Sequence, residues 1–159
     1  IKSMYACVKA KVRASENVTE SFMCPRGLKQ GENCSPVLFS LFINELAEEI
    51  VRQGRHGIPL PPDLLELLIL LFADDVVLLS YSVVGLQCQL NILSNTAIQL
   101  GLTVNRDKSK VVIFRNGGHV AAAEKWFYNG ERLEMVNEYK YLGVIFSTRL
   151  TFSYALDST

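Results

Sequence analysis

Two adjacent aspartates, Asp74 and Asp75, are the residues of this chain whose type and spacing indicate chemistry most clearly. They separate two nearly unbroken apolar runs, residues 64–72 and 76–79, which are too short for two helices. This pattern predicts a tight hairpin with both carboxylates at its tip. Adjacent like charges must stay solvated or bind a cation, and carboxylate oxygens suit Mg²⁺, which also binds substrate phosphates. A solvent-exposed acidic turn without an ion is the simpler alternative.

Two amphipathic helices are expected to pack beside this hairpin. The first is predicted from Pro36 to about Gln53, with Ser35 capping its start and Gly54 forming a left-handed cap at its end. The second is predicted over residues 84–100, with Gly101 as its stop. Three- and four-residue spacing predicts their core faces, namely Leu38, Phe39, Leu41, Phe42, Leu46 and Ile50 in the first and Leu86, Leu90, Leu93, Ala97 and Leu100 in the second.

Short strands are expected elsewhere in the chain. Alternating residues predict a hairpin of strands 5–13 and 18–24 with its turn at residues 15–17. Asn129-Gly130 predicts a primed two-residue turn between residues 126–128 and 133–136. Further strands are predicted at 102–104, 110–114 and 139–146, whereas the proline-rich residues 54–63 predict an exposed connector without regular structure. The elements together indicate an α+β fold.

Composition indicates a soluble, folded protein. Hydrophobic residues make up 49% and charged residues 20% of the 159 residues, which is too apolar for a disordered tail. The longest apolar stretch, residues 67–73, is far shorter than the ~20 residues of a membrane-spanning helix. No signal peptide is evident at the start, so we expect an intracellular protein.

The cysteines and histidines give no indication of a zinc site. Cys7, Cys24, Cys34 and Cys88 form no Cys-x-x-Cys pair, and His56 and His119 lie well away from them. We expect reduced, partly buried thiols, with disulfides in a secreted chain as the alternative.

Charge is distributed unevenly although the formal net charge is zero. Residues 1–30 hold six basic and two acidic groups, residues 31–75 two basic and eight acidic, and residues 76–159 eight basic and six acidic, which gives +4, −6 and +2. A basic opening segment beside an acidic middle suits a phosphate track next to a metal site, and solvated surfaces explain the asymmetry equally well.

Four sequence blocks resemble, in order, the reverse transcriptases of non-LTR (long interspersed element) retrotransposons. Phe72-Ala73-Asp74-Asp75 is similar to the aromatic-x-Asp-Asp motif of that family, and Tyr141-Leu142-Gly143 is similar to its primer grip. The other two blocks are Gly27-Leu28-Lys29-Gln30-Gly31 followed by Ser35-Pro36 and Leu38-Phe39, and Gly101-Leu102 followed by Asn105, Lys108 and Ser109. The resemblance covers roughly residues 20–146.

The resemblance implies a polymerase palm, with a ferredoxin-like antiparallel sheet and two packing helices, incomplete on its N-terminal side. It implies DNA synthesis from a DNA primer, an RNA template and dNTPs by two-metal phosphoryl transfer, with Mg²⁺ or alternatively Mn²⁺. Asp74 would be the principal catalytic metal ligand and Asp75 would support the metal site. The resemblance places Gln30, Gly31, Ala73 and Lys108 near the template and nucleotide, and Tyr141, Leu142 and Gly143 on the primer.

Each of these implied contacts has a structural alternative. Gln30 and Gly31 could form a plain loop before a helix, and Lys108 could be a solvated lysine in a connector. Tyr141 could be a buried aromatic in an amphipathic strand.

One catalytic aspartate of the family has no counterpart here. That residue lies upstream of the Gln30 block, where the only acids are Glu16 and Glu20, in or after the predicted turn. We therefore expect a piece of a longer protein that is inactive in isolation, or a non-catalytic retrotransposon remnant that at most binds nucleic acid. Within a partial reverse transcriptase domain over residues 1–159, the expected parts are an N-terminal hairpin (1–30), palm core (31–115), hairpin with primer grip (116–146) and truncated tail (147–159).

Overall fold

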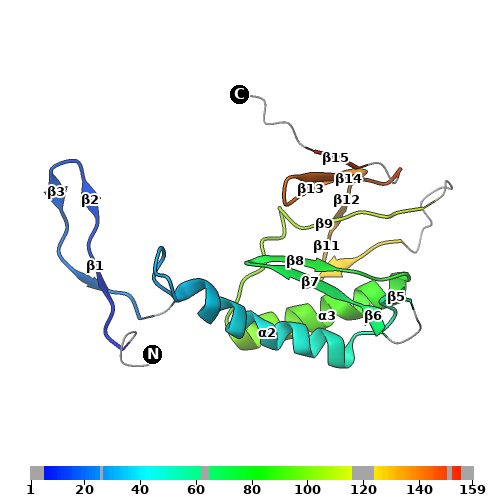
Figure 1. Ribbon diagram of the computed structural model, residues 1–159, viewed down its shortest axis with the longest axis horizontal. Helices are drawn as coiled ribbons and strands as arrows, with labels where there is room; N and C mark the ends of the chain where they lie inside the picture. Colours follow the sequence, from blue (N-terminus) through cyan, green and yellow to red (C-terminus); the bar gives the residue numbers. More distant parts are fainter. Residues whose placement is uncertain (1–5, 26, 62–64, 116–123, 150–151, 155–159) are drawn as a thin grey trace. The chain divides into compact units, whose positions relative to one another are not determined.

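The computed structural model describes residues 6–25, 27–61, 65–115, 124–149 and 152–154, the last three as backbone only. It is a mixed α+β structure in which the described residues form two helices and fifteen short strands (Figure 1). The chain divides into two units, Ile1–Asn44 and Glu45–Thr159, which are treated separately below. This confirms the α+β class.

The first unit contains a ribbon of four short strands. They are β1 (Lys9–Ala10), β2 (Arg13–Ala14), β3 (Asn17–Val18) and β4 (Phe22–Met23). Strand β1 pairs with β4 and β2 pairs with β3, both antiparallel, and the ribbon turns at Ser15-Glu16. The predicted N-terminal hairpin is confirmed for its described residues.

Helix α2 (Ser35–Gln53) continues from the first unit into the second. Its predicted start is right, but the Ser35 hydroxyl donates a hydrogen bond to the Lys29 carbonyl at 2.6 Å instead of capping the helix. Gly54 has no positive φ, so the predicted left-handed cap is wrong. Glycine is needed at this position because a Cβ there would clash with the Ile50 carbonyl oxygen.

The buried face of α2 is rotated from the predicted one. Leu46 and Ile50 are buried as expected, and Ile43 joins them. Leu41 is 70% exposed and Phe42 is 40% exposed, so their assignment to the core was wrong in this structure. Leu38 and Phe39 are half-buried.

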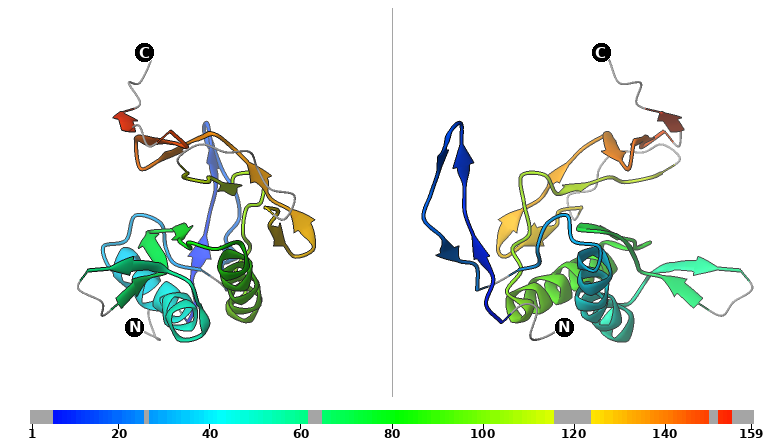
Figure 2. Two further views of the ribbon diagram at one scale, coloured as in Figure 1. Left: turned by 90° about the vertical axis from the view of Figure 1, so that its right-hand side faces the viewer. Right: turned by 60° about the vertical axis from the view of Figure 1, so that its left-hand side comes forward.

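The second unit is built from short hairpins around helix α3 (Val83–Leu100). Two antiparallel pairs precede α3, formed by β5 (Ile58–Leu60) with β6 (Leu65–Leu67) and by β7 (Ile69–Phe72) with β8 (Asp75–Leu78). The strands after it are β9 (Lys110–Val111), β10 (Phe127–Tyr128), β11 (Glu131–Arg132), β12 (Glu134–Met135), β13 (Glu138–Tyr141), β14 (Val144–Ser147) and β15 (Phe152–Tyr154). Helix α3 lies on one side of the β7–β8 hairpin, and the β13–β14 hairpin lies on the other side (Figure 1 and Figure 2).

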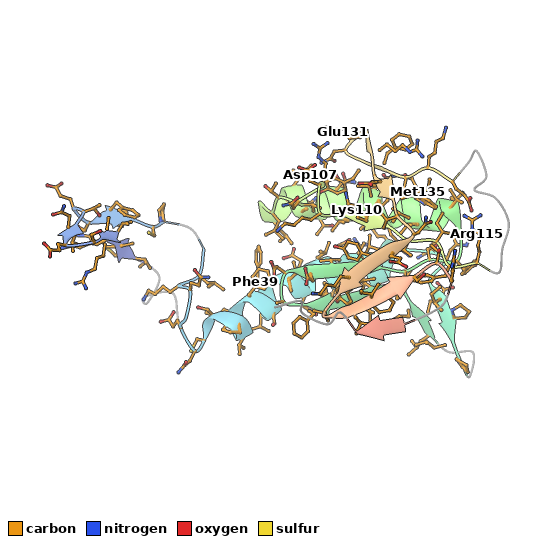
Figure 3. The ribbon with its side chains drawn as sticks, turned by 90° about the horizontal axis from the view of Figure 1, so that it is seen from above. Phe39, Asp107, Lys110, Arg115, Glu131 and Met135 are labelled. Carbon is orange, nitrogen blue, oxygen red and sulfur yellow. The ribbon has the colours of Figure 1, made fainter. Side chains whose placement is uncertain are left out.

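The ferredoxin-like sheet that the family resemblance implies is not found among the described residues. Six separate two-stranded ladders and one three-stranded ladder occur instead, and β9 pairs with β12 in parallel. The paired segments are only two to four residues long, and among them only β14 pairs with two neighbours. Lys110 of β9 and Met135 of β12 are labelled in Figure 3, where the two strands approach.

Several strand predictions need correction, and the predicted strand 110–114 is shorter, at Lys110–Val111. Ile58–Leu60 was expected to be irregular but pairs with β6. Pro59 is tolerated in this strand because the strand lies at an edge of its ladder. Residues 102–104 form no strand, since the Leu102 N–H donates to the Ala97 carbonyl and completes the end of α3. The predicted strand 139–146 is a hairpin, reversed at Leu142 (φ 48°) and Gly143 (φ 82°).

Helix α3 organises the core of the second unit. Ser82 accepts a hydrogen bond from the Gly85 N–H at its start, and Gly101 (φ 67°) ends it as predicted. Leu90, Leu93 and Ala97 are buried as expected, and the described cysteines are free. The turn Asn129-Gly130, with φ of 51° and 79°, is confirmed, but its second strand is β11 (Glu131–Arg132) and not the predicted residues 133–136. Residues 134–135 form β12 and pair with β9 instead.

The same helix holds strand β10 through polar contacts. The Trp126 indole N–H donates to the Val83 carbonyl at 3.1 Å. The Gln87 side-chain amide donates to the Phe127 carbonyl and accepts from the Phe127 N–H, both at 2.9 Å. The hairpin is therefore attached to the first turns of α3.

Leu46→Ala and Leu41→Ala form a matched pair that tests the observed orientation of α2. Leu46 is 2% exposed, so its truncation leaves a cavity and should lower the free energy of unfolding by about 2–5 kcal/mol. Leu41→Ala removes an exposed side chain and should change the free energy of unfolding by less than about 0.5 kcal/mol. Urea unfolding of both variants measures the difference, and equal losses would show that Leu41 is buried after all.

Candidate active site

The candidate site is centred on the turn between β7 and β8. Phe72 pairs with Asp75, so Ala73 and Asp74 form the two-residue reversal. Ala73 has a φ of 50°, an uncommon conformation for a residue with a Cβ. Asp74 and Asp75 are both exposed, which confirms the predicted hairpin with carboxylates at its tip.

The strands below the turn are attached to the rest of the second unit. The Leu79 N–H donates to the Leu68 carbonyl at 2.8 Å, which continues the pairing beyond the two strands. Gln89 of α3 is fully buried and donates from Nε2 to the Leu79 carbonyl at 2.9 Å. The base of the hairpin is thus held by α3, while its tip extends into solvent.

The chemistry of the two carboxylates fits a magnesium ion that has additional ligands. Within the described part of the chain, neither carboxylate makes an ion pair or hydrogen bond with another side chain. No group of three or more potential His, Cys, Asp or Glu ligands occurs among the described residues. Magnesium commonly takes one or two carboxylates and completes its octahedron with waters and substrate phosphates, so two exposed aspartates meet the protein's share.

Tyr141 lies close enough to the turn for the charge of Asp75 to act on it. It is the last residue of β13, directly before the Leu142-Gly143 reversal, and its ring is 6.5 Å from that of Phe146. Burial, and secondly the negative charge of Asp75, raise the pKa of Tyr141 above its ordinary value. The structure therefore brings the β13–β14 turn into the electrostatic range of the aspartate turn.

Lys108 belongs to a loop that is tied to the same hairpin. Its backbone N–H donates to the Asn105 side chain at 3.2 Å, and the Ser109 hydroxyl donates to the Asn105 carbonyl at 2.8 Å. The Tyr139 hydroxyl donates to the Lys108 carbonyl at 3.0 Å. The Lys108 side chain itself is exposed.

Gln30 and Gly31 lie in the first unit and are both exposed. Gly31 has a φ of 81°, so glycine is required there for the backbone conformation. The loop containing them is closed by the bond from Ser35 to Lys29. The predicted site residues that lie in the second unit are Ala73, Asp74, Asp75, Lys108, Tyr141, Leu142 and Gly143. Within this unit the charge of Asp75 acts on Tyr141, and the Tyr139 hydroxyl connects β13 to Lys108.

Tyr139 was not among the residues predicted for the candidate site. It links the Lys108 loop to the hairpin of Tyr141, and its i, i+2 spacing from Tyr141 in a predicted strand was the available signal. His56, for which no function was predicted, is hydrogen-bonded through Nδ1 to the Tyr81 hydroxyl at 2.9 Å.

Comparison with known proteins gives three matches for this chain. Residues 1–146 match the family described as reverse transcriptase (RNA-dependent DNA polymerase). The RNA-directed DNA polymerase from mobile element jockey of Drosophila funebris is 29% identical over 96% of the chain, and the Retrovirus-related Pol polyprotein from type-2 retrotransposable element R2DM of Drosophila melanogaster is 29% identical over 81%. The matched regions span 16% and 12% of those two proteins. Among the described residues, no helix is long and apolar enough to span a membrane.

Replacing Asp75 by asparagine tests the proximity of the two turns. Removing the negative charge should lower the pKa of Tyr141 towards its ordinary value, leaving the part caused by burial. A tyrosinate absorbance titration, with Tyr141→Phe subtracted to isolate this group, gives the value. Asp74→Asn is the matched control and should have the smaller effect, while an unchanged pKa in Asp75→Asn would contradict the arrangement.

Proposed function

We propose that this chain, because it belongs to the reverse transcriptase (RNA-dependent DNA polymerase) family, takes part in RNA-templated DNA synthesis and carries the metal-binding turn of the polymerase palm. The observation that carries the proposal is the exposed Asp74-Asp75 turn with Tyr141 in the electrostatic range of Asp75. The similarity to the jockey and R2DM proteins supports a non-LTR retrotransposon origin.

Asp74 is the principal metal ligand in this proposal, and Asp75 supports the metal site. Their exposure leaves room for substrate phosphates and water beside them. When bound, a pair of Mg²⁺ or Mn²⁺ ions activates the primer 3′-hydroxyl and stabilises the charge on the leaving pyrophosphate. The two carboxylates lie at a turn whose strands are attached to α3. Little rearrangement of the protein would therefore be needed when the metal ions bind.

Tyr141, Leu142 and Gly143 contact the primer in this proposal. The Tyr141 hydroxyl is protonated at neutral pH, and burial raises its pKa further, so it can donate a hydrogen bond to a primer phosphate oxygen. Leu142 and Gly143 are both exposed and have positive φ, which leaves the backbone of this turn open to a strand of nucleic acid. The nearness to Asp75 would place a primer end beside the carboxylates.

Lys108 would bind the nucleotide phosphates, and Gln30, Gly31 and Ala73 would lie near the template base and incoming dNTP. Support for Lys108 is its exposed ammonium group on a loop held by Asn105 and Tyr139. A cation there would offset charge that develops on the transferred phosphates. Gly31 and Ala73 support the proposal through positive φ at exposed positions, where backbone groups can approach a ligand closely.

The palm core would comprise residues 31–115, preceded by the hairpin of 1–30 and followed by the primer-grip segment of 116–146 and the tail of 147–159. We propose that a further catalytic aspartate comes from a longer polypeptide, because two carboxylates alone give an incomplete two-ion site. The 159 residues by themselves would then be inactive. The chain covers only a small part of the length of the relatives that it matches, which supports this division.

Primer extension by the longest open reading frame that contains these residues tests the function. Asp74→Ala should lower incorporation of dNTPs on an RNA template by at least about 100-fold, because one ligand of the reacting ions is lost. Glu45→Gln removes an exposed carboxylate on α2 and is the matched control, expected to keep nearly full activity. Undiminished synthesis by Asp74→Ala would refute the assignment, and no synthesis by the native protein would favour a non-catalytic remnant.

Removal of divalent ions gives an independent test. Chelation by EDTA should abolish primer extension, and excess Mg²⁺ should restore it, with Mn²⁺ as a second effective ion. The measurement is the amount of extended primer before chelation, after it and after the addition of each ion. Synthesis that persists in excess chelator would contradict a magnesium site at Asp74 and Asp75.

A further inference from the structure

The ribbon of β1 to β4 has a one-residue irregularity between its two ladders. Lys9 pairs with Met23 in the first ladder, and Arg13 pairs with Val18 in the second. Two residues on one strand, Lys11 and Val12, therefore lie opposite three on the other, 19–21. The Val12 N–H donates to the Thr19 hydroxyl at 3.0 Å, and the Thr19 N–H donates back to the Val12 carbonyl. Such a bulge increases the twist of a ribbon while keeping its two strands together.

Three cations share one face of this ribbon. Lys9 lies in β1, Arg13 lies in β2, and Lys11 lies in the two-residue link between these strands. They alternate with Ala10, Val12 and Ala14, and we infer from this alternation that the three cations share one side, defined here as the basic face. All three are exposed, and none makes an ion pair within the described residues. Their observed cross-strand neighbours, Met23 and Val18, are apolar and half exposed.

The basic face carries a row of like charges that form no ion pair within the described residues. Alternate residues in a strand are about 6.8 Å apart, which is less than the screening length of about 8 Å at physiological salt. The three cations therefore repel one another. Glu16 lies at the turn of the ribbon, and Glu20 lies among residues 19–21 opposite Lys11 and Val12, where it makes no ion pair within the described residues. Figure 3 draws side chains projecting from both sides of this ribbon. A polyanion laid along the row would relieve the repulsion.

The dimensions of the row match a nucleic-acid backbone. From Lys9 to Arg13 the strand covers about 13 Å, which is similar to the rise of four nucleotides of one strand along the axis of a duplex, at about 3.4 Å each. Lysine and arginine are the usual donors to phosphate oxygens, and such contacts carry no base specificity. Exposed Val18 and Met23 on the same face can contact sugars between the phosphates.

We propose that the basic face of the β1–β4 ribbon, through Lys9, Lys11 and Arg13, binds the sugar-phosphate backbone of the nucleic acid that the protein copies. The choice of nucleic acid as the partner rests on the proposed function, whereas the site is separate from the residues assigned to catalysis. The contact is electrostatic and independent of sequence. It anchors a strand of the RNA–DNA duplex and takes no part in the chemical step.

The experiment measures binding without catalysis. Fluorescence anisotropy with labelled RNA–DNA hybrid, single-stranded RNA and duplex DNA gives Kd over a series of salt concentrations, with no dNTP and no divalent ion. The triple variant Lys9→Gln, Lys11→Gln and Arg13→Gln should bind the hybrid about 10–100-fold more weakly near physiological salt. The slope of log K against log salt should fall in magnitude by about 3, close to one for each lost phosphate contact.

A charge-matched variant distinguishes a local site from a general loss of positive charge. Lys125→Gln, Arg132→Gln and Arg149→Gln remove three exposed cations from the second unit. This control should keep the salt slope close to that of the native protein, and an equal fall in both triple variants would overturn the proposal. Lys9→Arg with Lys11→Arg keeps the charge and should retain native binding, so a loss there would also overturn it.

The two proposals can fail separately. Weak binding by the ribbon variant, combined with undiminished synthesis by Asp74→Ala, would reject the catalytic assignment and leave the basic face standing. Native binding and an unchanged salt slope in the ribbon variant, combined with inactive Asp74→Ala, would reject the basic face alone. If the ribbon variant loses affinity for the RNA–DNA hybrid more than for duplex DNA, the hybrid is identified as the partner. A loss of affinity for duplex DNA only would reject the hybrid as the partner.

Discussion

The attachment of the β7–β8 hairpin to helix α3 is the interaction on which the candidate active site depends. Gln89 is completely buried, and its side-chain amide donates to the Leu79 carbonyl just beyond β8. Leu90, Leu93 and Ala97 form the apolar face of the same helix. A buried amide that loses its partner is costly, so this bond specifies one position of the strand along the helix. The exposed aspartates can then keep their carboxylates in water while the strands beneath them stay in place.

Two interactions link three short segments that are distant in sequence. The charge of Asp75 reaches Tyr141, and the Tyr139 hydroxyl bonds to the backbone of Lys108. Tyr139 and Tyr141 both belong to β13, so one strand relates the aspartate turn to the lysine loop. A polymerase must position a primer end, a nucleotide and metal ions together. Strand β13 interacts with both the aspartate turn and the lysine loop, which are the segments proposed to bind the metal ions and the nucleotide.

Local patterns in the sequence predicted much of this arrangement. The periodicity of α3 and the Asn129-Gly130 turn were right because they depend on residues close in the chain. The exposed face at Leu41 was not predictable, because a helix face is selected by its tertiary neighbours. The reversal at Leu142 was missed because leucine rarely adopts positive φ. The aspartate turn followed from two adjacent apolar runs, whereas its nearness to Tyr141 is a tertiary relation without a local signal.

The double hydrogen bond of Gln87 with Phe127 has a consequence for the solubility of the β10–β11 hairpin. A side-chain amide carries the same donor and acceptor as a peptide group, so Gln87 occupies the outer edge of β10 as a neighbouring strand would. Open strand edges invite pairing with other chains and the growth of aggregates. Helix α3 thereby shields this two-residue strand from intermolecular β-sheet formation with a single side chain.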